Sequence, residues 1–297
     1  MIEQYELVQL ANGTFSIRLL ANGETFHPVI GPIAEADALY IRQLKLRERA
    51  TYRRDPAGPG TRQDAGGTLD PFVIWDVGLG AGGNVLTTLH RLNDAPTHLH
   101  IISFDHTLGA VRFALEHAGP LQFPIGFESV LEELLRTQRA EFRHCALQVS
   151  WEIHVGDFPD ALAALPPAWP TPHAIFFDAF SPARNPAMWT LPLFENLFRR
   201  LDPQRPCALA TYSRSTIPRV TLLLAGFFVG AGEPVAEKEE TTIAANSLAL
   251  IERPLGARWL ERARTSHSAE PLHANEYRIA PLTPETWERL RAHPQFK

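Results

Sequence analysis

The sequence predicts an α/β fold organised around a mostly parallel sheet of seven strands, preceded by a small N-terminal hairpin and helix. Three observations carry this prediction. From Phe72 onward, short apolar runs alternate with helical stretches, which is the pattern of a parallel sheet covered by helices. The first apolar run ends in a glycine cluster at residues 78–83. Only a polar loop separates the last two runs, which predicts an antiparallel pair of strands at one edge.

The N-terminal elements precede the sheet. Asn22-Gly23 lies between strand-like runs at Thr14–Leu20 and Glu24–His27, which predicts a β-hairpin with its turn at this pair. Apolar residues recur at helical spacing from Ile33 to Arg49, so we expect a helix there. Residues 55–70 are rich in proline and glycine, which predicts a loop before the main domain.

The strands of the sheet follow in order along the chain. We expect them near residues 72–77, 99–105, 148–155, 173–178, 206–212, 226–232 and 243–251, with helices between most of them. The stretch Gly126–Arg139 is predicted to be an additional helix before the third strand. The chain is therefore expected to consist of an N-terminal hairpin and helix packed on the main domain (1–54), the main domain itself (71–253) and a C-terminal extension (254–297).

Composition restricts the class of protein. The chain has 297 residues, of which 45% are hydrophobic and 21% charged, and it has no apolar run of about 18 residues that would span a bilayer. A secretory signal is not expected, because the first residues lack a basic segment followed by an apolar one. Two cysteines without C-x-x-C spacing and 12 scattered histidines predict no metal site. We therefore expect a cytoplasmic protein.

The charge distribution does not by itself indicate a nucleic-acid partner. The formal net charge is −5, whereas affinity for phosphates comes from Lys and Arg. One segment, Arg42–Arg54, holds six basic residues against Glu48 alone. It is interpreted either as an RNA-binding patch or as a solvated helix face, and the sequence does not separate the two.

The glycine cluster predicts a cofactor site. Gly78, Gly80 and Gly82 follow the first strand, and glycines allow a backbone to approach a ligand closely. The related spacing of Gly78, Gly80 and Gly83 would also suit a dinucleotide, but Asp76 would repel a pyrophosphate and attract a cation. S-adenosylmethionine carries a sulfonium and an ammonium group and no phosphate. The turn therefore predicts a Rossmann-like class I methyltransferase fold, with a glycine-rich turn beside an exposed Asp76 as the simpler alternative.

Further carboxylates follow the second and third strands. Asp105 ends the second strand about twenty residues after the glycines, the spacing at which an acid reaches a ribose diol, although Asp also commonly caps a helix. Asp157 follows a glycine, so its carboxylate is predicted to accept a hydrogen bond from the adenine amino group while Phe158 covers a ring face. Capping of the following helix is the alternative for Asp157.

The fourth strand leads into the most distinctive segment of the chain. Asp178 emerges at the carboxyl edge of the sheet, where ligands bind in open α/β folds. A carboxylate there can accept a hydrogen bond from an amine, aim its lone pair and take up the released proton, which predicts a catalytic role. Phe180 is expected to provide a wall for a flat base in the substrate. Trp189 is a candidate substrate contact, with simple packing as the alternative.

The run Asp178–Trp189 resembles the MnmC-type methyltransferase family, in which a fragment similar to D-G-F-A-P-A-K-N-P-x-M-W follows the fourth strand. The segments Thr25–His27 and Gly31–Ala36 resemble the short opening of the same family. The resemblance implies methylation, with S-adenosyl-L-methionine, of 5-aminomethyl-2-thiouridine at the wobble position of certain tRNAs. It also implies that Asp178 is the active-site carboxylate and that Asp76–Gly82 is the cofactor loop. Glu35, within the opening, is expected to bind substrate.

The chain also departs from that family. Bifunctional members carry a flavin-dependent oxidase domain, for which this sequence has neither the length nor a second glycine fingerprint, so a stand-alone methyltransferase is expected. The Glu233–Thr242 loop is acidic, which weakens the case for tRNA. Three alternatives stay open: a spermidine-synthase-like aminopropyltransferase, although Arg184 would repel a polyamine; a non-catalytic nucleotide-binding module; and a nicotinamide-dependent reductase.

Overall fold

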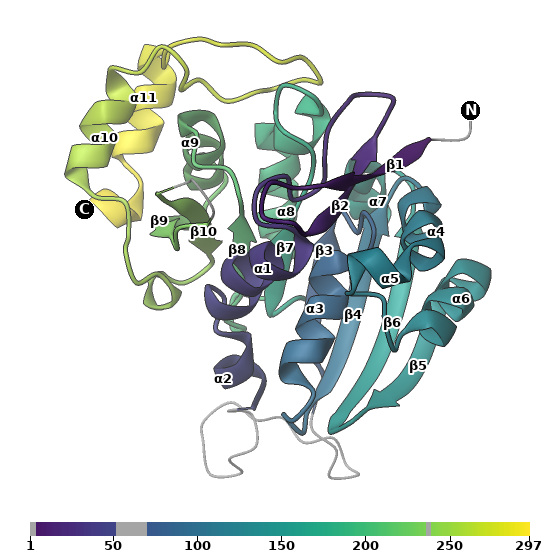
Figure 1. Cartoon of the computed structure of the whole chain (residues 1–297). Coiled ribbons are helices and arrows are strands. Elements are labelled where there is room, and N and C mark those ends of the chain that lie inside the picture. The colour runs from purple at the N-terminus through teal and green to yellow at the C-terminus, as the bar shows by residue number, and fades with distance from the viewer. Residues whose placement is uncertain (1–3, 52–69, 236–238) are drawn as a thin grey trace. The chain divides into compact units, whose positions relative to one another are not determined.

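A computed structural model describes residues 4–51, 70–235 and 239–297 (Figure 1). The chain folds into two compact units, Met1–Asp157 and Phe158–Lys297. The α/β fold class predicted from the sequence is confirmed. The predicted division into 1–54, 71–253 and 254–297 stays a prediction.

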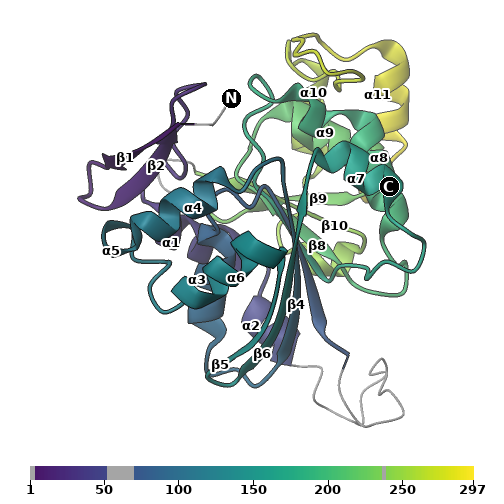
Figure 2. The same ribbon diagram turned by 90° about the vertical axis from the view of Figure 1, so that its right-hand side faces the viewer.

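The first unit contains four strands of the sheet. β3 (Phe72–Val77), β4 (His98–Asp105) and β6 (Leu147–Val155) are parallel, and β5 (Arg139–His144) pairs antiparallel with β6. Every residue of β3 is buried, as expected for a strand whose two faces are both covered. The helices of this unit are α3 (Gly83–Leu92), α4 (Gly109–Glu116), α5 (Ala118–Leu121) and α6 (Glu128–Thr137). Figure 2 shows α3, α4 and α6 on the same side of these strands.

The strand β5 was not predicted. Its sequence, Arg-Ala-Glu-Phe-Arg-His, lies just after the correctly predicted helix α6, and three of its six side chains are exposed. An edge strand with so many charged residues gives little of the apolar signal on which the prediction rested. Among the described residues, the two units together contain eight strands besides those of the N-terminal hairpin, one more than the seven expected for the sheet.

The N-terminal region forms the predicted turn at Asn22-Gly23 and, before it, a hairpin that was not predicted. β1 (Tyr5–Gln9) pairs antiparallel with β2 (Phe15–Leu19), and the chain reverses at Asn12-Gly13, where Gly13 has φ +85°. The predicted Asn22-Gly23 turn follows β2 and returns the chain along it. The Leu19 N–H donates to Glu24 O (2.9 Å), the Phe26 N–H donates to Ile17 O (2.8 Å), and Arg18 and Thr25 form an antiparallel bridge. Both Asn-Gly pairs therefore form turns, and the element that the sequence analysis missed is β1.

The predicted helix at residues 33–49 is broken into three pieces. α1 (Pro32–Ala36) continues into a π-helical segment (Asp37–Arg42), and α2 (Leu46–Thr51) begins only after Lys45, which has φ +50°. The apolar face is buried as predicted, with Leu39 and Tyr40 completely covered. Periodicity identified the buried face, but it does not distinguish a regular helix from one interrupted by a π turn.

Part of the basic segment Arg42–Arg54 is involved in ion pairs. Arg42 Nε lies 3.2 Å from Asp37 Oδ2, and Arg47 Nη1 lies 2.8 Å from Asp94 Oδ1. Arg53, Arg54 and most of the predicted 55–70 loop lie outside the described residues. RNA binding by this segment stays a prediction.

The second unit holds the other four strands. β7 (Ala174–Phe177) and β8 (Ala208–Thr211) are parallel, and β10 (Thr241–Ala245) lies antiparallel between β8 and β9 (Phe228–Gly232). The predicted antiparallel pairing of the last two strands is thus confirmed. The accompanying helices are α7 (Phe158–Ala164), α8 (Leu191–Arg200) and α9 (Thr216–Leu224).

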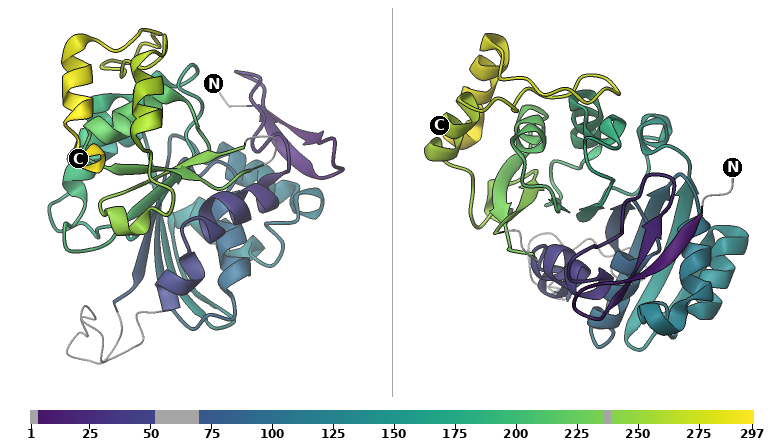
Figure 3. Two further views of the ribbon diagram at one scale, coloured as in Figure 1. Left: turned by 90° about the vertical axis from the view of Figure 1, so that its left-hand side faces the viewer. Right: turned by 45° about the horizontal axis from the view of Figure 1, so that its top comes forward.

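The C-terminal extension is part of the second unit. It forms α10 (Ala257–Arg264) and α11 (Pro284–Arg291), which lie side by side in Figure 3. Between these helices the chain passes α8, where the Leu191 N–H donates to Leu272 O at 2.7 Å. Near the C-terminus, the side chain of Gln295 accepts from the Val229 N–H (2.7 Å) and donates to Val229 O (2.8 Å). Within the described ranges, none of the helices has the length and apolar character needed to cross a membrane.

Candidate active site

The glycine turn after β3 has a backbone that requires its glycines. Gly78, Gly80 and Gly82 have φ values of +93°, +54° and +81°, the region that L-residues with a Cβ rarely adopt. The N–H groups of Gly78 and Leu79 donate to Phe104 O at 2.9 and 3.2 Å, which ties the turn to β4. Gly82 then precedes the first residue of α3, and no described side chain caps this helix start. Because the N–H groups of Gly78, Leu79 and Gly82 are bonded within the protein, the N–H groups that the sequence predicts to face the site are those at the start of α3.

Asp76 is buried rather than exposed. The residue is 1% exposed, and its Oδ2 accepts a hydrogen bond from Ser103 Oγ at 2.8 Å. Trp151 Nε1 in turn donates to Ser103 Oγ at 2.9 Å. The alternative of a glycine-rich turn beside an exposed Asp76 is therefore wrong. A buried carboxylate, held by neighbouring strands, places negative charge two residues before the turn, and its role toward the cofactor stays a prediction.

Asp105 contacts the glycine turn directly. Its Oδ2 accepts a hydrogen bond from the Gly80 N–H at 2.8 Å, and its Oδ1 lies 3.3 Å from the Thr107 N and 3.0 Å from His106 Nδ1. A carboxylate has room for about four hydrogen bonds, so these contacts leave capacity for about one more, from the ribose that the sequence assigns to Asp105. The bond to Gly80 spans 25 positions, and sequence spacing alone did not reveal it.

The predicted adenine contacts, Asp157 and Phe158, lie where the two units meet in sequence. Asp157 is exposed and ends the first unit, whereas Phe158 begins α7 and is 4% exposed. Their assignment to adenine binding stays a prediction.

Asp178 follows β7 in a loop that is held on both sides. Tyr212 Oη donates to Ala179 O at 3.0 Å, and Trp189 Nε1 donates to Phe180 O at 2.8 Å. Asp178 and Phe180 are both partly exposed, which leaves their side chains accessible. These bonds restrain the backbone next to the predicted catalytic carboxylate.

Trp189 packs inside the second unit. It is completely buried, and its ring lies 5.2 Å from that of Phe177, centroid to centroid. Together with the bond to Phe180 O, these contacts favour the packing alternative for Trp189. Its assignment to substrate binding stays a prediction.

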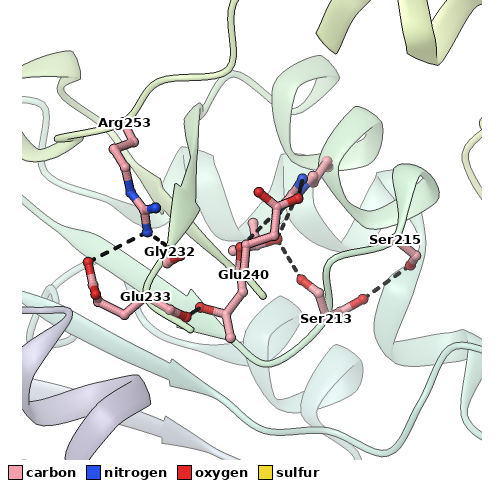
Figure 4. Close-up of polar contacts among 9 residues, drawn as sticks. Ser213, Ser215, Gly232, Glu233, Glu240 and Arg253 are labelled. Carbon is pink, nitrogen blue, oxygen red and sulfur yellow. Dashed lines mark hydrogen bonds and ion pairs between the residues drawn. The ribbon is translucent and has the colours of Figure 1, made fainter. Parts of the chain in front are cut away.

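A buried arginine, which the sequence analysis did not single out, ties together the ends of β8 and β10. Two residues of its network, Ser213 and Glu240, are labelled in Figure 4. Arg219 on α9 is 0% exposed and donates hydrogen bonds to Thr242 Oγ1 (3.0 Å), Glu240 Oε1 (2.8 Å) and Thr241 O (2.8 Å). Thr242 Oγ1 in turn donates to Ser213 O at 2.5 Å. Burial lowers the pKa of the Arg219 guanidinium, an effect that the ion pair with Glu240 opposes.

This network fixes the chain that holds the Asp178 loop. Ser213 is fixed through Thr242, and its neighbour Tyr212 is the residue that bonds Ala179 O. A charged residue within the apolar stretch of α9, Thr-Ile-Pro-Arg-Val-Thr-Leu-Leu-Leu, was the signal that could have pointed to Arg219.

The N-terminal segment that resembles the MnmC-type opening lies on the glycine turn. A Cβ placed on Gly80 would lie 3.5 Å from the Phe26 ring, and one placed on Gly83 would lie 3.2 Å from Pro32 Cβ. Glu35 on α1 is 7% exposed, and its Oε1 lies 3.6 Å from His27 Nδ1. Substrate binding by Glu35 stays a prediction. In the described ranges, no three His, Cys, Asp or Glu side chains are grouped so that they could hold a metal ion.

Comparison with known proteins supports the interpretation of the glycine turn and the Asp178 loop as parts of a methyltransferase site. A family model described as S-adenosyl-L-methionine-dependent methyltransferase matches residues 126–247. The tRNA 5-methylaminomethyl-2-thiouridine biosynthesis bifunctional protein MnmC of Paraburkholderia phymatum is 26% identical over 215 residues, covering 69% of this chain and 29% of that protein. The MnmC protein of Aeromonas hydrophila is 32% identical over 177 residues, covering 53% and 25%. The chain thus spans less than a third of the length of these relatives.

Among solved structures, MnmC2 from Aquifex aeolicus superposes with a TM-score of 0.69 at 25% identity, covering 97% of this chain and 84% of the other. The resemblance predicted from the Asp178–Trp189 motif is confirmed by these matches, as are the enzyme class and the cofactor, S-adenosyl-L-methionine.

Proposed function

We propose that this chain, an MnmC-like S-adenosyl-L-methionine-dependent methyltransferase, acts on tRNA and converts 5-aminomethyl-2-thiouridine at the wobble position to 5-methylaminomethyl-2-thiouridine. The observation that carries the proposal is the segment from Asp178 to Trp189, whose acidic residue begins a loop restrained at Ala179 and Phe180. The similar MnmC proteins are named for biosynthesis of this nucleoside. Because the chain spans less than a third of them, the proposal concerns the methylation step alone.

The proposed roles follow from the chemistry of the groups. The cofactor, when bound, supplies an electrophilic methyl group on its sulfonium. Asp76, the glycine turn and Asp105 are proposed to bind it, with Asp157 and Phe158 at the adenine. Asp178 is proposed to accept a hydrogen bond from the acceptor amine, to direct the lone pair of the amine at the methyl group and to take the released proton.

The acceptor is proposed to be a base presented out of its stack. An aminomethyl group on a stacked wobble base would be hard to bring into line with a methyl donor, so the base must be unstacked or flipped. Phe180, partly exposed beside Asp178, is proposed to pack against the ring of that base, and Glu35 to contribute to substrate binding. The proposed location of the enzyme, with its tRNA substrate, is the cytoplasm.

Methyl transfer to tRNA tests the proposal. Labelled S-adenosylmethionine is incubated with the full chain and total tRNA from cells that lack their wobble-uridine methyltransferase. Label in the 5-methylaminomethyl-2-thiouridine fraction is expected, and Asp178→Asn should lose it while still binding S-adenosylhomocysteine. Intact cofactor binding without label in any tRNA nucleoside would refute the tRNA assignment. A product from decarboxylated S-adenosylmethionine and putrescine would favour an aminopropyltransferase instead.

A further inference from the structure

His27 lies against the glycine turn and has no part in the roles described so far, and it is paired with Glu35, which has been proposed only to contribute to substrate binding. His27 follows the hairpin and Glu35 lies on α1, so both belong to the first unit, as does the turn. A Cβ placed on Gly83 would lie 4.0 Å from His27 Nε2, which puts the imidazole edge next to the first residue of α3. The two side chains are only 11% and 10% exposed. An ionisable pair is thus held at the wall of the cofactor turn rather than on open surface.

The surrounding contacts fix His27 in this position. Its φ is +47°, a left-handed conformation that few non-glycine residues adopt. The preceding Phe26 packs near Gly80, and Ser16 Oγ of β2 donates a hydrogen bond to Phe26 O. The conformation of this segment is therefore maintained by the hairpin on one side and by the glycine turn on the other.

The geometry of the pair defines which ligand group it suits. Glu35 Oε1 lies 3.6 Å from His27 Nδ1, an ion-pair distance that favours the tautomer with its proton on Nδ1. In that tautomer Nε2, the nitrogen nearer the turn, is a hydrogen-bond acceptor. The carboxylate of Glu35 adds negative charge behind it. An acceptor with an anion behind it suits a cationic donor, and the α-ammonium group of the cofactor is such a donor.

We propose that His27, oriented by Glu35, accepts a hydrogen bond from the α-ammonium group of the methionyl part of the cofactor. The carboxylate of the same methionyl part then lies at the N–H groups that begin α3, where no described side chain caps the helix. The ammonium and the carboxylate of the methionyl part are thus bound by different parts of the first unit. The inference rests on the cofactor assignment and does not depend on which acceptor is methylated.

Binding of paired ligands tests the contact. Dissociation constants are measured by calorimetry on the full chain for S-adenosylhomocysteine and for its desamino analogue, which keeps the carboxylate but lacks the α-amino group. For His27→Ala we expect S-adenosylhomocysteine to bind about 10-fold or more weakly, as for a lost hydrogen bond to a charged group, with the desamino analogue changed less than about 2-fold. Glu35→Gln should also weaken the binding of S-adenosylhomocysteine. His27→Gln, which keeps an acceptor oxygen, should recover part of the affinity.

The controls separate recognition from folding. Alanine is strained at φ +47°, so His27→Ala is expected to lower stability, but a general disturbance of the turn would weaken both ligands equally. His90→Ala, the same substitution in the last turn of α3, should change neither ligand. Equal weakening of both ligands, or no weakening of either by His27→Ala, would overturn the inference. Failure of the unaltered chain to bind S-adenosylhomocysteine would overturn the cofactor assignment as well, whereas failure to methylate tRNA would affect the proposed function alone.

Discussion

Replacement of Arg219 by methionine removes a buried charge that three acceptors share. The guanidinium is completely covered and bonds Thr242 Oγ1, the Glu240 carboxylate and Thr241 O, all at 2.8–3.0 Å. Breaking a buried ion pair from one side typically costs about 3–5 kcal/mol. Because the Glu240 side chain is 32% exposed and can regain water, we expect a loss near the lower end, about 3 kcal/mol.

Denaturant unfolding of the full chain measures this loss. The matched control is Arg291→Met, because Arg291 pairs with Glu288 on the surface, where both side chains are 57% exposed and a change below about 1 kcal/mol is expected. Arg219→Lys should fall between the two, since an ammonium group can keep the Glu240 contact but not the fork of three bonds. A loss below about 1 kcal/mol in Arg219→Met would refute the reasoning that this network holds the ends of β8 and β10 together.

Three further outcomes are expected. Asp178→Asn should lower turnover by about 10²- to 10⁴-fold in a methyl-transfer assay while leaving the dissociation constant of S-adenosylhomocysteine within about 2-fold, and equal turnover would exclude a role as proton acceptor. Tyr212→Phe, which removes the hydroxyl that donates to Ala179 O beside Asp178, should lower kcat by about 10-fold with the same cofactor affinity; unchanged kcat would show that the bond does not position the loop. Hydrogen bonds from His100 and His154 lower the pKa of Glu152 from 4.5 to about 2, so its contribution to stability is full above about pH 4.5 and lost as the pH falls toward 2. Unfolding of Glu152→Gln should therefore depend less on pH across that window than unfolding of the unaltered chain, and parallel curves would contradict this.

The sequence predicts those features that depend on local pattern. The apolar runs expected to be the first three strands form β3, β4 and β6 within one residue of the predicted bounds. The glycines at 78, 80 and 82 adopt the left-handed conformations that their residue type allows. Failures occur where the local pattern is weak. The first strand, β1, and its Asn12-Gly13 turn were not recognised before the predicted Asn22-Gly23 turn, and the polar edge strand β5 carried too weak a signal to be recognised.

The candidate site shows the same limit at the level of side chains. The sequence identifies Asp105 and Asp178 by their positions at the ends of strands, but not the Gly80 N–H that binds the first or the Tyr212 hydroxyl that restrains the loop of the second. Neither partner can be found by spacing, because each contact crosses 25 or more positions and depends on the register of separate strands. Arg219 was missed for a related reason: its partners follow a different strand, and nothing in its own helix specifies them.

The supports of the glycine turn explain why a methyltransferase of this kind would keep residues before its first sheet strand. A turn with three positive φ values is not stabilised by its own sequence, since glycine loses more conformational entropy on folding than any other residue. Its conformation is maintained from outside: Asp105 accepts the Gly80 N–H, Phe104 O accepts two further N–H groups, and the segment from Phe26 to Pro32 packs over Gly80 and Gly83. The N-terminal segment is therefore part of the structure that holds the turn. Substitutions that loosen its packing should weaken cofactor binding even though they lie some fifty residues before the glycine motif.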